Sequence, residues 1–223
     1  LDLFVGTHIG DLYFYRNTGT ASDPAFTLET ETLVQLNFPS RSAPTFADID
    51  NDGDLDLFVG KSLGKISFYR NTGTASDPIF TLEIDDFASI QVGIGSVPAY
   101  TDVDNDGDFD LFVGDHKGNI YFYRNSGSSS IPDLTLDTKN FLSTIAVESG
   151  SNPTLSDIDN DGDLDLFIGK WLGNIHFYRN TGTSSNPAFT LETEEFADIN
   201  VTWSFPTFAD IDNDGDLDLF VGK

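Results

Sequence analysis

The chain contains no cysteine and no methionine, and it has few basic residues. Without cysteine, neither a disulfide nor a thiolate metal site can hold the fold together. Eleven Lys and Arg stand against 37 Asp and Glu among 223 residues, which gives a net charge of −26. This acidity argues against binding to nucleic acid, whose phosphates attract Lys and Arg, and against docking on anionic membrane surfaces. No apolar run approaches the roughly 20 residues of a membrane-spanning helix, so we expect no membrane insertion.

Sustained helical periodicity is also missing, and four short phrases recur instead. The phrase LDLFVG, or a close variant, begins at residues 1, 55, 109, 164 and 217, so the repeat period is about 54 residues. Phrases of the types FYRNTG, FTLE and PTFADID follow it in a constant order. Each unit therefore indicates four short strands separated by Gly, Asn and Pro turns.

Both sides of the LDLFVG strand are apolar. In the second copy, Leu55, Leu57 and Val59 would face one side of a sheet and Phe58 the other. A sheet with one wet face would alternate more clearly, whereas blades stacked around an axis bury both faces. The sequence therefore predicts an all-β propeller built from four-stranded antiparallel blades.

The order of the phrases also predicts where each blade begins and ends. If the Pro-led strand is innermost, the chain is a single repeat domain (1–223) with three complete and two partial blades. The expected units are a partial blade with strands 2 to 4 (1–43), three complete blades (44–97, 98–152 and 153–205) and a partial blade with strands 1 and 2 (206–223). Propellers usually have between about four and eight blades, so we expect this chain to be an excerpt of a larger array.

Four Asp-rich loops carry the candidate chemistry. Each lies between the Pro-led strand and LDLFVG, with acidic residues at loop positions 1, 3, 5, 7 and 9 and Gly at position 6. So many like charges within nine residues repel one another unless a cation neutralises them. Calcium takes about six to eight oxygen ligands in flexible geometry, so we expect about four Ca2+ sites. The expected metal ligands, with the peptide carbonyl serving at position 7, are Asp48, Asp50, Asp52, Asp54, Asp56, Asp102, Asp104, Asp106, Asp108, Asp110, Asp157, Asp159, Asp161, Asp163, Asp165, Asp210, Asp212, Asp214, Asp216 and Asp218.

Two other kinds of loop share part of this pattern. An EF-hand shares the D-x-D-x-D-G start, but it requires Glu at position 12 and flanking helices. Position 12 is Val59, Val113, Ile168 or Val221, so the EF-hand interpretation fails. Solvated acidic turns are the plain alternative, because Asp, Asn and Gly favour turns. Four copies that all keep the carboxylates favour the calcium loop over that alternative.

The D-x-D-x-D-G-x-x-D loop, followed by LDLFVG and a Gly-rich hairpin, resembles the FG-GAP and VCBS repeats of integrin α-like calcium-binding β-propellers. The resemblance covers essentially the whole chain. It implies a propeller that is usually seven-bladed, with ions on its lower face and ligands on the opposite face. The repeats here are more alike than in an integrin, and clear FG and GAP phrases are absent.

A few positions differ between the otherwise similar repeats, and these could line a ligand face. They are His8, Ser62, His116 and Trp171, at equivalent turns before the third strand, together with Trp203 in a variable stretch. Unconstrained surface turns would give the same variation. The three histidines do not form a catalytic set, and no nucleophile or phosphate-loop motif is present, so we expect no enzyme.

We therefore expect an extracellular, secreted or cell-surface calcium-binding module for adhesion or for binding a protein or glycan. Millimolar calcium outside cells would keep weak sites filled. A structural subunit of a calcium-dependent surface layer or filament, formed by self-assembly, is the alternative. A polysaccharide-acting enzyme or its accessory domain is the second alternative.

Overall fold

The computed structural model describes residues 1–34, 36, 41–128, 132–137, 145 and 147–223, which form an all-β structure apart from two 3-10 turns. The strands form five antiparallel sheets, and strands that follow one another in the chain are neighbours in each sheet. The first sheet holds β1 (Leu3–Gly6), β2 (Leu12–Asn17) and β3 (Phe26–Thr30). The second holds β4 (Ser42–Ala47), β5 (Asp56–Lys61), β6 (Ile66–Asn71) and β7 (Phe80–Ile84). The third holds β8 (Val97–Thr101), β9 (Asp110–Gly114), β10 (Ile120–Asn125) and β11 (Leu134–Leu136). The fourth holds β12 (Ser151–Ser156), β13 (Asp165–Lys170), β14 (Ile175–Asn180) and β15 (Phe189–Thr193), and the fifth holds β16 (Phe205–Ala209) and β17 (Asp218–Gly222).

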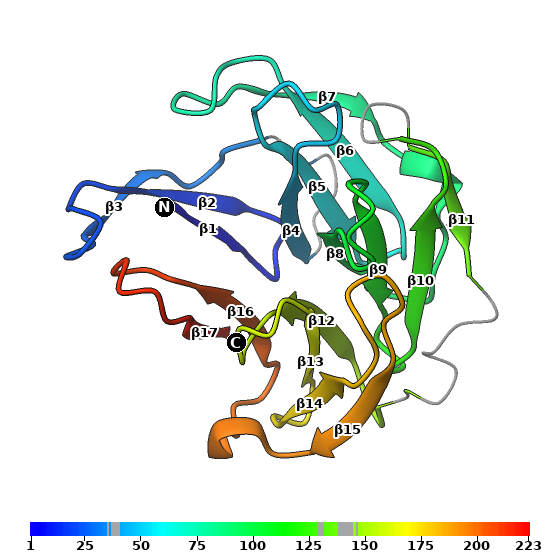
Figure 1. The fold of residues 1–223 in the computed structure, drawn as a ribbon. Helices are drawn as coiled ribbons and strands as arrows, with labels where there is room; N and C mark the ends of the chain where they lie inside the picture. The colour runs from blue at the N-terminus through cyan, green and yellow to red at the C-terminus, as the bar shows by residue number, and fades with distance from the viewer. Residues whose placement is uncertain (35, 37–40, 129–131, 138–144, 146) are drawn as a thin grey trace.

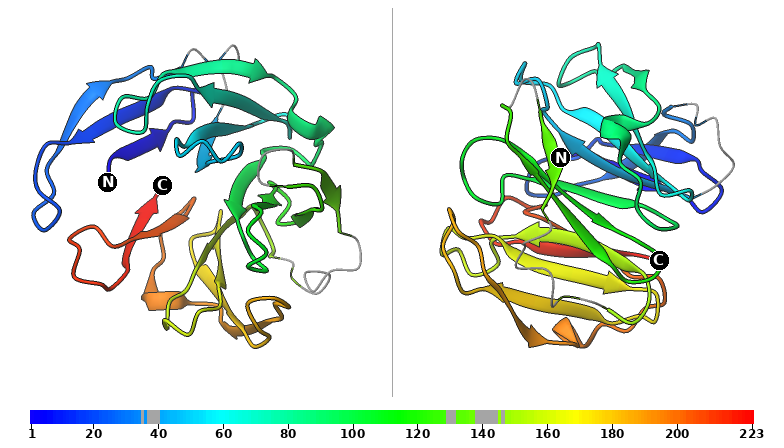
Figure 2. Two further views of the ribbon diagram at one scale, coloured as in Figure 1. Left: turned by 45° about the horizontal axis from the view of Figure 1, so that its top comes forward. Right: turned by 90° about the vertical axis from the view of Figure 1, so that its right-hand side faces the viewer.

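The five sheets are arranged around a common centre, as the blades of a propeller are (Figure 1). The Pro-led strands β4, β8, β12 and β16 are innermost, and each contacts the next one around the centre (Figure 2). The predicted β-propeller of four-stranded antiparallel blades is therefore confirmed. The sequence also predicts that the stretches 30–43 and 138–152, which vary between repeats, join consecutive blades, and both lie partly outside the described residues.

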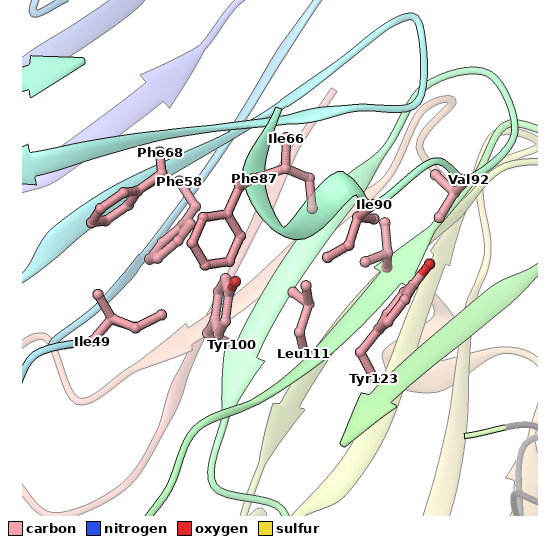
Figure 3. Packing of buried hydrophobic residues seen from close by; sticks show 12 residues of the cluster. Ile49, Phe58, Ile66, Phe68, Phe87, Ile90, Val92, Tyr100, Leu111 and Tyr123 are labelled. Atoms are coloured by element: carbon pink, nitrogen blue, oxygen red, sulfur yellow. The ribbon is translucent and has the colours of Figure 1, made fainter. Parts of the chain in front are cut away.

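The apolar side chains pack between blades rather than inside one sheet. Every residue of β5 is buried, because Leu57 and Val59 pack toward the first sheet while Phe58 packs toward the third. Figure 3 shows the second contact, where Phe58 and Phe87 lie against Tyr100 of the neighbouring blade. The ring centroids of Phe58 and Tyr100 are 4.3 Å apart. Burial of both strand faces is what the apolar pattern predicted.

The expectation for Leu55 was wrong. Its side chain is 54% exposed, whereas Leu57 and Val59 are fully buried. The strand begins only at Asp56, so Leu55 still belongs to the Asp-rich loop and does not follow the alternation of the strand.

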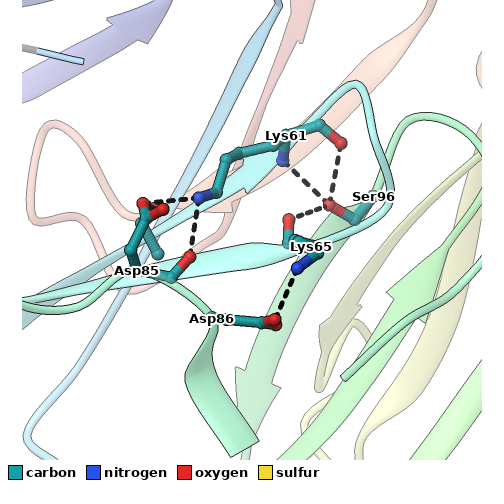
Figure 4. Close-up of polar contacts among 6 residues, drawn as sticks. Lys61, Lys65, Asp85, Asp86 and Ser96 are labelled. Atoms are coloured by element: carbon teal, nitrogen blue, oxygen red, sulfur yellow. Dashed lines mark hydrogen bonds and ion pairs between the residues drawn. The ribbon is translucent and has the colours of Figure 1, made fainter. Parts of the chain in front are cut away.

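A repeated serine fixes each blade to the next one. Ser96, just before β8, accepts a hydrogen bond from the Lys61 N–H at 2.9 Å and donates to the Lys65 carbonyl oxygen at 2.7 Å (Figure 4). The equivalent serines, which begin or directly precede a Pro-led strand, make the same pair of bonds to the preceding blade: Ser42, Ser151 and Ser204. We call these four residues the clamp serines. A Cβ atom at Gly60 would lie 2.2 Å from the Ser96 carbonyl oxygen, so the final glycine of LDLFVG permits this close approach.

Candidate metal centres

Each Asp-rich loop is a tight turn held by its own first carboxylate. In the first loop, Asp48 Oδ1 accepts the Asp52 N–H at 3.1 Å, and Asp48 Oδ2 accepts the Gly53 N–H at 2.9 Å. Asn51 and Gly53 have φ angles of 57° and 92°, in the left-handed region that Asn and Gly tolerate best. The loops that begin at Asp102, Asp157 and Asp210 repeat this pattern.

The carboxylates at loop positions 1, 3 and 5 converge in all four loops. In each loop one oxygen from every one of the three residues lies within 4.8 Å of the others. The four groups are Asp48, Asp50 and Asp52; Asp102, Asp104 and Asp106; Asp157, Asp159 and Asp161; and Asp210, Asp212 and Asp214. Two unit charges at that distance repel by about 3.5 kcal/mol at an effective dielectric constant of about 20. The folded loop therefore concentrates negative charge at one point.

The acidic residue at position 9 contributes a buried carboxylate. Asp56 Oδ1 accepts the Asn71 N–H at 2.7 Å, but Asp56 Oδ2 is buried without a hydrogen-bond partner. Burial raises the pKa of Asp56 to about 6, and it raises those of Asp110 and Asp165 to about 7 and about 6. A buried carboxylate oxygen without a partner is costly, so these atoms indicate a missing positive charge.

An arginine from the third strand of each complete blade approaches the loop from the other side. Arg70 pairs with Asp50 and also with Glu83, so one guanidinium joins the loop to the outermost strand. Arg124 pairs with Asp104 and Asp137, and Arg179 pairs with Asp159 and Glu192. In the first two of these blades the other oxygen of the position-3 carboxylate, Asp50 Oδ1 or Asp104 Oδ1, is buried without a partner.

These residues fit a hard divalent cation. The converging donors are all oxygens, and several of the carboxylate oxygens are buried with no protein partner. The side chains at positions 7 and 9 lie outside the converging groups, so the carbonyl ligand expected at position 7 and the carboxylate ligand expected at position 9 stay predictions. The last loop also differs at position 9, because Asp218 is exposed and its Oδ2 accepts the Ile211 N–H at 3.3 Å. The clusters are thus compatible with Ca2+.

The five residues expected on a ligand face do not all come together. His116, Trp171 and Trp203 form one cluster, with 4.2 Å between the ring centroids of His116 and Trp171. His8 is exposed and Ser62 is half-buried, and neither lines the small cavity beside that cluster.

Sequence reasoning missed the clamp serines and Arg41. The S-x-P pattern at the start of each Pro-led strand was the signal for the serines. Arg41 lacked such a signal, because the rings it contacts belong to residues 203 and 205.

No helix among the described residues is long and apolar enough to cross a membrane.

Comparisons with known proteins agree with the repeat architecture. The model of the FG-GAP-like repeat matches residues 1–59, 102–168 and 157–221. Over 142 residues, 56% of this chain, the sequence is 28% identical to integrin alpha-4 of Xenopus laevis. The matched part is only 14% of the length of that integrin. Because the repeat model covers most of the sequence, the chain belongs to the FG-GAP-like repeat family.

Proposed function

We propose that this chain is a calcium-stabilised propeller module that binds a protein or glycan ligand outside the cell and catalyses no reaction. The observation that carries the calcium part is the set of converging carboxylates with buried, unpartnered oxygens. An adhesion-type role is supported by the FG-GAP-like repeats and by the similarity to an integrin α chain.

The ion would be held by the side chains at loop positions 1, 3, 5 and 9. In the first loop these residues are Asp48, Asp50, Asp52 and Asp56. A bound cation would supply the positive charge that offsets repulsion between these carboxylates, and it would fix the turn between the two innermost strands of the blade. Because such a site exists only in the folded chain, binding adds directly to the free energy of unfolding.

Calcium removal tests this proposal. At a calcium concentration about 100-fold above Kd, each site adds about 2.7 kcal/mol of stability. For a domain of this size, 1 kcal/mol moves Tm by about 2–4 °C. We therefore expect calcium to raise Tm by more than about 10 °C relative to the protein in chelator, measured by calorimetry. An unchanged Tm would contradict the calcium role.

A matched pair of loop variants locates the effect. Asp52→Asn removes a converging charge, although the amide oxygen can still accept the Asp54 N–H. Asp54→Asn removes a charge two residues away, outside the converging group, and keeps the peptide carbonyl. We expect Asp52→Asn to reduce the calcium-induced rise in Tm by about a quarter, since one of four sites weakens, and Asp54→Asn to leave it nearly unchanged. Equal effects of the two variants would show that calcium acts only through general charge neutralisation.

A further inference from the structure

An open cavity of about 120 Å3 lies in the fourth blade (β12 to β15), between the turn after β13 and the connection that follows β15. Its lining residues are Asn174, Glu195, Asp198, Ile199 and Asn200. Two carboxylates and two amides therefore surround one apolar side chain. The strand β13 runs from the Asp-rich loop to this turn, and six extended residues span about 20 Å, so salt largely screens the loop charges at the cavity.

The second blade (β4 to β7) has the same backbone at the equivalent place. In both blades a valine N–H of the connection donates to the carbonyl oxygen of a turn glycine at 3.1 Å, from Val201 to Gly173 and from Val92 to Gly64. The 3-10 turns of the two connections both hold their last two residues in the left-handed region, with φ angles between 52° and 55°. Because the backbones match, the lining residues can be compared one by one. Their equivalents in the second blade are Lys65, Asp86, Ser89, Ile90 and Gln91.

In the second blade a lysine of the chain itself fills this place. Lys65 Nζ lies 2.6 Å from Asp86 Oδ2 (Figure 4). The Gln91 side-chain amide donates to the Leu63 carbonyl oxygen at 2.8 Å and so lies over the turn. The carboxylate at this position therefore binds an ammonium group in the blade where the chain supplies one.

The fourth blade keeps the carboxylate but loses the lysine. Asn174 and Asn200 have shorter side chains than the Lys and Gln of the second blade, and Asp198 adds a second carboxylate beside Glu195. Within the described part of the chain, Glu195 and Asp198 form no ion pair, and the side-chain amides of the two asparagines make no hydrogen bond. The cavity thus has the acceptors of the second blade, and one more, without their cation.

An ammonium group fits these acceptors better than a metal ion does. Calcium takes about six to eight oxygen ligands. Among the described residues, the converging groups of three acidic side chains all belong to the Asp-rich loops, and neither Glu195 nor Asp198 is a member of one. An ammonium group has only three N–H donors, which two carboxylates and two amide oxygens can satisfy. Ile199 offers an apolar contact for the methylene groups of a lysine side chain.

We propose that this cavity binds the ammonium group of a lysine side chain that a protein partner presents. The inference rests on the proposed function as a binding module, and it selects a protein over a glycan as the ligand. The lysine of the partner would take the place that Lys65 has in the second blade, with Glu195 in the position of Asp86. The net charge of −26 attracts a basic partner over a long distance, so the charge of the chain favours this encounter.

A lysine peptide tests the site directly. The tripeptide acetyl-Gly-Lys-Gly-amide is titrated into the calcium-loaded, 15N-labelled chain, and the side-chain amide signals of Asn174 and Asn200 report on the cavity. We expect a saturable shift of these signals, and at least about 10-fold weaker binding of the same peptide with an acetylated, uncharged lysine. Equal binding of the two peptides, or no response to either, would overturn the site. A response of these signals to additional Ca2+ but not to the lysine peptide would replace the lysine assignment with a metal site.

Variants that each add one positive charge test the residues. Asn174→Lys rebuilds the arrangement of the second blade, so we expect it to weaken peptide binding about 10-fold or more while Tm stays unchanged or rises slightly. We expect a similar loss of binding for Glu195→Gln. Glu31→Gln makes the same change in charge at an exposed carboxylate of the first blade and should change binding less than about 2-fold. Full affinity in Asn174→Lys, or equal losses in Glu195→Gln and Glu31→Gln, would contradict the proposal.

The calcium dependence of Tm, measured on the same samples, separates this inference from the proposed function. If calcium raises Tm but the peptide gives no shift, the lysine site is wrong and the calcium-stabilised module stands. If calcium leaves Tm unchanged, the proposed function itself fails.

Discussion

His176 is a buried imidazole without a hydrogen-bond partner on either ring nitrogen. The equivalent positions in the other blades hold Tyr13, Ser67 and Tyr121, so the repeat does not need a histidine here. Burial lowers the pKa of His176, and Lys170 lowers it further, against smaller opposing effects of Glu194 and Glu148. The folded state therefore holds this side chain neutral.

This burial predicts a loss of stability in mild acid. As pH falls below the unfolded pKa of about 6.5, the unfolded chain gains a proton that the folded chain takes up only at lower pH. Each pH unit between the two pKa values then costs up to about 1.4 kcal/mol. We expect His176→Gln to lower the dependence of Tm on pH between about 7.5 and 5.5, measured by thermal unfolding with calcium present. Parallel curves for the two proteins would contradict this assignment.

At the scale of single residues, the sequence predicts some parts of the candidate site and not others. The convergence of the carboxylates at loop positions 1, 3 and 5 was predictable because the three residues lie within five positions and a local turn brings them together. The cluster around Arg41 was not, because it joins side chains that are distant in the sequence and close only in the folded molecule. His116, Trp171 and Trp203 were singled out from their variation between repeats, but their stacking needed the structure.

At the scale of elements, the recurring phrases and the turn residues between them predicted the strands, while the contacts between blades came from the structure. The apolar residues on both sides of β5 indicated burial on both faces, and Figure 3 shows the Phe58 side of that packing. The clamp serines join neighbouring blades through hydrogen bonds instead of apolar packing. Each is a buried polar residue, and its hydroxyl group adds hydrogen bonds to two backbone groups of the preceding turn that also bond to each other.

Removal of one clamp serine should therefore lower the free energy of unfolding. Ser96→Ala removes the hydroxyl bonds to the Lys65 carbonyl and the Lys61 N–H, although these two groups still bond to each other at 2.9 Å. The loss of such a hydrogen bond costs about 0.5–1.5 kcal/mol. We expect a matching decrease in the free energy of unfolding in denaturant titrations, and a change below about 0.5 kcal/mol for the exposed Ser76→Ala. A neutral Ser96→Ala would mean that water replaces the hydroxyl.

At the scale of the whole molecule, the main feature is the large negative net charge. The net charge of −26 would become −18 with four bound Ca2+ ions, since each ion adds two positive charges. Self-repulsion of this size destabilises a compact state, and salt screens it.

We therefore expect the chelated protein to gain stability when NaCl is raised from about 0.05 to about 0.5 M, and the calcium-loaded protein to gain clearly less. Thermal unfolding at both salt concentrations measures the difference. Equal gains in the two forms would show that the ions do not relieve the repulsion within the loops.

The bonds of the clamp serines all have the same direction along the chain, because each serine bonds to the blade that precedes it in the sequence. The Lys61 N–H donates to the Ser96 hydroxyl group, and this hydroxyl donates to the Lys65 carbonyl oxygen. Ser96 follows Lys61 by 35 residues and belongs to the next blade. On a ribosome that adds about 5–20 residues per second, the turn of one blade would wait about 2–7 s for the serine of the next. Each newly made blade therefore completes the one synthesised before it, and folding would proceed along the chain in the order of translation.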